Sequence, residues 1–121
     1  MNRQDNTVLC MARQKRKYRR FKLRYPVRVK FSGELVSEVD AVSRNVSAGG
    51  LFLETPLPIP EFSSVNFLLI LHGRQLGLPI ELAGEGEVVR VELCGPDVGF
   101  GIAVKCTRPM NQLESFLSPS D

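Results

Sequence analysis

The chain contains 121 residues, of which 43% are hydrophobic and 24% are charged, with a formal net charge of +3. This length corresponds to one domain, and the composition is that of an ordinary globular protein rather than of a low-complexity chain. The longest apolar run, Phe67–Leu71, is far shorter than the roughly 18–20 residues of a membrane-spanning helix.

Charge is distributed unevenly along the chain. Residues 1–24 carry nine Lys and Arg side chains against one Asp, whereas residues 25–121 carry seven against twelve Asp and Glu. A basic arm, residues 1–24, is therefore attached to a mildly acidic body. Such an arm attracts phosphates, anionic lipid or nucleic acid, although a solvated tail that only aids solubility has the same composition.

The sequence pattern changes after residue 14 and again at Tyr25. Residues 1–14 have no periodicity, and we expect them to form a flexible tail ahead of a domain spanning residues 15–118. From Tyr25 onward, apolar and polar residues alternate with the period of 2 that indicates a half-buried strand. The expected strands cover residues 25–31, 36–46, 51–54, 64–72, 80–93 and 98–106. A connector is expected at Gly73–Gly77.

Only the C-terminal segment has a helical period. In residues 108–117, Met110, Leu113, Phe116 and Leu117 recur at spacings of three and four, which predicts a short helix capped by Thr107. Gly84 and Gly86 inside the fifth strand indicate a bulge or a sharp bend. The sequence therefore predicts an all-β fold, a small six-stranded antiparallel β-barrel with a short C-terminal helix.

Residues suited to catalysis or metal binding are scarce. The single histidine, His72, ends an apolar strand, and Glu85 and Glu87 share one strand face that solvent is expected to cover. No cluster of Cys and His has the spacing of metal ligands, and no phosphate-binding Gly-rich motif of the Walker type is present. We therefore predict no enzyme activity, no metal and no cofactor. The N-terminus has no secretory signal pattern, and three widely spaced cysteines suit a reduced compartment, so we expect a cytoplasmic protein.

Two short motifs stand out from this background. Arg20 and Arg24 form an R-x-x-x-R pattern just before the first expected strand. Asn45, Ser47 and Gly50 form an N-x-S-x-x-G pattern in a tight connection between two strands. In this order and at this spacing, the two motifs resemble the signature of the PilZ domain, R-x-x-x-R followed by [D/N]-x-S-x-x-G. The resemblance runs from about residue 19 to residue 117 and includes the strands at 87–91 and 99–104.

The resemblance implies that the chain is a receptor for the bacterial second messenger cyclic di-GMP. It implies that Arg20 and Arg24 grip the ligand, because a guanidinium can clamp a phosphate, stack on a purine or bond guanine N7 and O6. A dianionic ligand would neutralise part of the basic arm and order residues 15–24 against the barrel. The newly ordered surface would then signal to an effector protein, which the sequence does not identify.

The same resemblance assigns the receiving wall of the site. Asn45 is expected to meet polar groups on a guanine edge, Ser47 to bond base or phosphate, and Gly50 to let backbone approach the ligand. The residue just before R-x-x-x-R is Arg19, and arginine at this position is associated in the family with two stacked ligand molecules per chain. A third guanidinium would offset the repulsion between the two dianions.

Two other classes of function fit parts of the sequence. A small nucleic-acid-binding barrel would use the basic arm to follow a phosphate backbone. The acidic body and the absence of outward aromatic side chains on the expected strands make nucleic acid the weaker prediction. A ligand-independent protein-interaction module, in which the nucleotide site is vestigial, is the other alternative.

Overall fold

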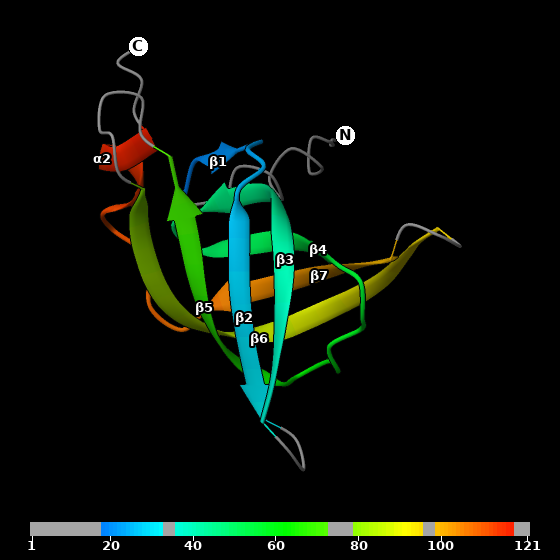
Figure 1. Ribbon diagram of the computed structural model, residues 1–121. Coiled ribbons are helices and arrows are strands. Elements are labelled where there is room, and N and C mark those ends of the chain that lie inside the picture. The colour runs from blue at the N-terminus through cyan, green and yellow to red at the C-terminus, as the bar shows by residue number, and fades with distance from the viewer. Residues whose placement is uncertain (1–17, 33–35, 73–78, 96–98, 118–121) are drawn as a thin grey trace, which may run out of the picture.

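The computed structural model describes residues 18–32, 36–72, 79–95 and 99–117 (Figure 1). The predicted flexible tail, residues 1–14, and the predicted connector Gly73–Gly77 lie outside these residues. The described elements are β1 (Arg20–Phe21), β2 (Pro26–Ser32), β3 (Val36–Ser47), β4 (Gly50–Thr55), β5 (Ser64–Leu71), β6 (Ile80–Gly95), β7 (Gly99–Cys106) and helix α2 (Leu113–Leu117).

The strands close into a barrel. They form one antiparallel sheet in the order β1-β3-β2-β5-β6-β7-β4, and β3 pairs with β4 as well as with β2. Strands β2 to β7 are therefore a closed six-stranded antiparallel barrel, which confirms the predicted fold class. In Figure 1, β2, β3 and β5 cross β4 and β7 at a steep angle, and the strongly bent β6 joins the two groups. β1 is a short seventh strand that the sequence did not predict.

The alternation seen in the sequence places one side of each strand in the core. Val27 and Val29 on β2, and every second residue of β5 from Val65 to Leu71, are buried, while their neighbours are exposed or half-buried. Period-2 side chains on a closed sheet fill the barrel interior in this way. Because the interior is filled, a ligand pocket of this barrel has to lie on the outer face of the sheet.

β6 is long because it pairs with two different strands, β5 and β7, along its length. It pairs with β5 as far as Glu87 and with β7 from Gly86 onward, so the two pairings overlap at only two residues. The glycines lie at this changeover: a Cβ on Gly84 would meet the Phe67 ring, and one on Gly86 would lie 2.6 Å from the Lys105 carbonyl oxygen. The expected bend is thus present, but the register shifts of β6 lie further along the strand.

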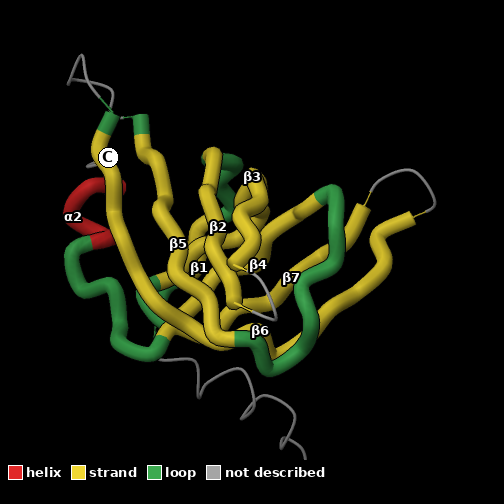
Figure 2. The backbone as a smooth tube through the Cα atoms, turned by 60° about the horizontal axis from the view of Figure 1, so that its bottom comes forward, coloured by secondary structure: helices red, strands yellow, loops and turns green. Residues whose placement is uncertain are grey.

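Helix α2 is shorter than the sequence pattern predicted. It begins at Leu113, and Met110 lies before it with its backbone N–H donated to the Ala48 carbonyl at 2.7 Å. Thr107 donates its N–H to Glu85 and caps no helix, so the prediction of a helix from residue 108 was wrong. Figure 2 shows α2 close to the barrel wall at one end of the molecule. Within the described part of the chain, no helix is long and apolar enough to cross a membrane.

Candidate functional site

A register shift in β3 brings two consecutive side chains to the outer face of the barrel. Ala41 and Ser43 are buried on the inner face, and the pairing with β4 shifts between Ser43 and Asn45. Val46 is buried again, so Arg44 and Asn45 both point outward although they are adjacent. A β-bulge has this effect because one extra residue re-aims the side chains around it.

β6 contains a matching irregularity. Val88 is buried, the pairing with β7 shifts between Val88 and Arg90, and Val91 is again partly buried. Val89 and Arg90 are both exposed as a result. The two shifts face each other across β4 and β7, and each adds an arginine to the same outer surface.

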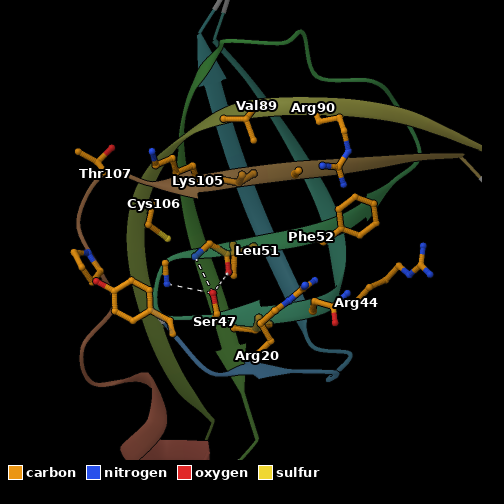
Figure 3. Close-up of a pocket in the computed structure, with 18 of the residues that line it drawn as sticks. Arg20, Arg44, Ser47, Leu51, Phe52, Val89, Arg90, Lys105, Cys106 and Thr107 are labelled. Carbon is orange, nitrogen blue, oxygen red and sulfur yellow. Dashed lines mark hydrogen bonds between the residues drawn. The ribbon is translucent and has the colours of Figure 1, made fainter. Parts of the chain in front are cut away.

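The outer face of β3, β4, β7 and β6 contains a pocket of about 1050 Å³ (Figure 3). Its volume is slightly above the roughly 300–1,000 Å³ typical of small-molecule sites. Asn45, Phe52, Ala103 and Arg90 lie opposite one another in register across the four strands. The small side chain of Ala103 leaves the centre of this row open.

Four of the six predicted site residues line the pocket: Arg20, Asn45, Ser47 and Gly50. The two halves of the sequence motif meet directly, because β1 pairs with the end of β3 and places Arg20 opposite Ser47. Arg19 and Arg24 are not among the lining residues. The guanidinium of Arg19 lies over the Phe21 ring instead, 5.3 Å from its centroid.

The described lining of the pocket is strongly cationic. It contains four cations and one carboxylate: Arg20, Arg44, Arg90, Lys105 and Glu92. The guanidinium carbons of Arg44 and Arg90 lie 5.4 and 5.7 Å from the centroid of the Phe52 ring. A surface with this charge attracts anions, and flat guanidinium and aromatic groups can stack on a purine.

Ser47 is committed to the turn between β3 and β4. Its Oγ accepts hydrogen bonds from the N–H groups of Gly49 and Gly50, both at 3.2 Å, and donates to the Gly50 carbonyl at 3.3 Å (Figure 3). A serine hydroxyl often fixes a turn in this way. The side chain that was expected to bond the ligand therefore also shapes the wall on which a ligand would rest.

The structure gives Gly50 a packing role. A Cβ at this position would lie 2.5 Å from the carbonyl oxygen of Val104 on β7. Because this oxygen belongs to the backbone, the contact could be relieved only by a shift of the paired strands. At Gly49, a Cβ would lie 2.7 Å from Cδ2 of the Tyr18 ring. Gly50 therefore allows the close approach of β7, and Gly49 allows the close approach of the Tyr18 ring.

The end of the arm is bonded to the barrel by a buried serine. Ser43 Oγ accepts the N–H of Tyr25 at 2.9 Å and donates to the Leu23 carbonyl, and its own N–H donates to the Tyr25 carbonyl at 2.9 Å. These bonds hold the backbone on both sides of Arg24. In the structure, residues 18–24 therefore lie along the barrel from β1 to β2.

Arg24 forms an ion pair at the edge of the pocket. Its two terminal nitrogens donate to the Glu54 carboxylate at 2.9 and 3.5 Å, and Arg44 Nε lies 3.3 Å from the same carboxylate. The hydrogen bond from Arg24 lowers the pKa of Glu54, and partial burial opposes this effect. Glu54 is therefore ionised at neutral pH and connects the arm to the bulge on β3.

Sequence reasoning missed several lining residues. The alternation of residues 51–54 could have placed Phe52 on the outer face, and the statement that the strands carry no outward aromatic side chain was wrong at this position. Nothing in the sequence marks the bulges that re-aim Arg44 and Arg90. The described residues contain no group of three or more His, Cys, Asp or Glu side chains that could hold a metal.

The fold and the pocket define a small β-barrel that attracts anions to its outer face. The model of the PilZ domain matches residues 14–117, and the chain belongs to this family of binding and adaptor modules. No curated protein matches the sequence closely enough to serve as a relative.

Solved structures agree with this assignment at the level of the fold. Ten solved chains match, among them the inhibitor of motility MotI/DgrA from Bacillus subtilis, with a TM-score of 0.67 and 19% sequence identity. The similarity covers 86% of this chain and 48% of that protein, so the chain spans about half the length of this neighbour.

Proposed function

We propose that this chain is a bacterial, cytoplasmic receptor module for cyclic di-GMP. The observation that carries the proposal is that Arg20, Asn45, Ser47 and Gly50, which come from two separate motifs, line one cationic pocket. The ligand has two phosphates and two guanines. Guanidinium groups suit the phosphates and guanine N7 and O6, and Phe52 offers an aromatic surface to a base.

Arg24 joins the site through an exchange of partners. In the structure it is bonded to Glu54, and its side chain is 61% exposed. An ion pair with a solvent-exposed guanidinium contributes little net stability, so a ligand phosphate can compete for the guanidinium at little cost. We infer that Arg24 leaves Glu54 and contacts the ligand when cyclic di-GMP binds.

Calorimetric titration at physiological salt tests the proposal. We expect saturable binding of cyclic di-GMP and weaker binding, strongly reduced by added salt, of a random oligonucleotide. Preferential binding of the oligonucleotide would favour the nucleic-acid alternative. Binding of neither would leave a ligand-independent interaction module.

The same titration measures stoichiometry, for which we propose two ligands per chain. Two stacked molecules bring four phosphate charges into one site, and we infer that Arg19, whose guanidinium lies over the Phe21 ring in the structure, turns toward them as a further cation. We expect Arg19→Leu to reduce the stoichiometry from two ligands to one, with the first affinity changed less than about tenfold. One ligand per chain in the unmodified protein would contradict this role.

We further propose that the ligand orders the arm and that an effector protein recognises the result. The bonds of Ser43 fix residues 23–25, so the change is expected upstream of this anchor. Hydrogen exchange and trypsin cleavage should show protection of residues 16–22 on addition of cyclic di-GMP, with residues 1–12 unchanged. Equal protection of residues 16–22 in both states would exclude the ordering mechanism.

A further inference from the structure

Among the described lining residues of the pocket, one carboxylate lies beside four positively charged side chains. Glu92 lines the site, and its Oε2 accepts a hydrogen bond from Arg90 Nε at 2.6 Å. The side chains of Arg90 and Glu92 are 57% and 47% exposed. A negative charge at this position weakens the attraction of the pocket for phosphates, so a receptor for a dianion gains nothing from it electrostatically.

The bulge on β6 explains why the two side chains act together. Arg90 and Glu92 are two apart on the same strand and therefore share the outer face, in register with Ala103 and Gly101 of β7. Their contact uses the Nε of Arg90 and one carboxylate oxygen. The terminal guanidinium nitrogens can thus present donors to a ligand, and the second carboxylate oxygen and the remaining lone pair of Oε2 can present two acceptors beside them.

This order of donors and acceptors matches one edge of guanine. Along its Watson–Crick edge guanine presents the O6 acceptor and then the N1–H and N2–H donors, which complement an arginine followed by a carboxylate. Adenine presents the N6 amino donor and then the N1 acceptor, so it would face donor with donor and acceptor with acceptor. A site built in this way rejects the wrong base strongly, because its polar groups are left unpaired.

We propose that Glu92 is a specificity-determining residue that reads the N1–H and N2–H groups of a guanine, with Arg90 directed at O6. The inference rests on the proposed function, since it assigns one residue of the same site. Asn45, the residue of the motif expected to meet a guanine edge, has a single carbonyl oxygen and cannot accept both donors as a carboxylate does.

The test compares cyclic di-GMP with cyclic di-IMP, which lacks the 2-amino group of guanine but keeps both phosphates and O6. We expect the unmodified protein to prefer cyclic di-GMP by about 10–150-fold, the range for a hydrogen bond to a charged group. In Glu92→Gln, which keeps only a neutral acceptor oxygen, this ratio should fall by at least about fivefold. Glu81→Gln, which removes a carboxylate from the same strand outside the pocket, is the matched control and should keep the full ratio.

The ratio separates base reading from a structural role. If Glu92 only holds Arg90 in place, Glu92→Gln will weaken both ligands equally and leave the ratio unchanged, which overturns the inference. An unmodified protein that does not distinguish the two ligands overturns it as well. If the unmodified protein binds neither ligand, the proposed function itself fails. This outcome is distinguishable from the others because no affinity ratio can then be measured.

Discussion

Replacing Arg20 with alanine is expected to weaken the binding of cyclic di-GMP about 5–150-fold, equivalent to about 1–3 kcal/mol for one good bidentate contact. Arg20 already lines the pocket and lies opposite Ser47 in the sheet. Arg24→Ala is expected to fall in the same range, because we propose that this residue leaves Glu54 and contacts the ligand. Titration calorimetry on the purified variants measures both effects.

Lys22→Ala is the matched control for this experiment. It removes one positive charge from the same part of the arm, is exposed, and does not line the pocket. General attraction of the arm for an anion would make all three variants similar, and this outcome would refute the assignment of the two arginines. The melting temperatures should change little, since the backbone pairing of β1 does not need the Arg20 side chain and the Arg24 ion pair is exposed.

The barrel could be predicted because its strands obey simple rules. Val27 and Val29 alternate with charged residues, and the structure buries the valines and exposes their neighbours. β1 could not be predicted in this way, since two residues in a basic segment show no period. The helix was predicted too long because the apolar spacing includes Met110, whose N–H is bonded to the turn between β3 and β4.

Only those site residues that belong to a sequence motif could be predicted. The motif residues Arg20, Asn45, Ser47 and Gly50 line one pocket, although the sequence alone offered no physical reason for their approach. The remaining cations escaped notice for a geometric reason. Strand alternation assigns adjacent residues to opposite faces, and the bulges at Arg44 and Val89 break this rule at the two places where it mattered.

Gly50→Ala is expected to destabilise the free protein by about 1–3 kcal/mol, or to lower Tm by roughly 4–15 °C, the effect of forcing an extra methyl group into a packed site. The added Cβ would lie 2.5 Å from the Val104 carbonyl oxygen. The surrounding backbone has little freedom to withdraw. Cys106 donates its N–H to the Gly49 carbonyl at 2.9 Å and Met110 donates to Ala48 at 2.7 Å, so the turn is bonded to the chain on both sides of β7's end.

Gly49→Ala is the natural comparison, because it places the same methyl group one residue earlier in the same turn. Its Cβ would meet the Tyr18 ring, a side chain that can rotate away without disturbing the sheet. We therefore expect Gly49→Ala to lower Tm by less than about 4 °C, or under about 1 kcal/mol. Thermal unfolding followed by circular dichroism distinguishes the two variants. Equal Tm values would mean that β4 and β7 accommodate the added methyl group as easily as the Tyr18 side chain does. Gly50 would then not be required by the packing of the barrel.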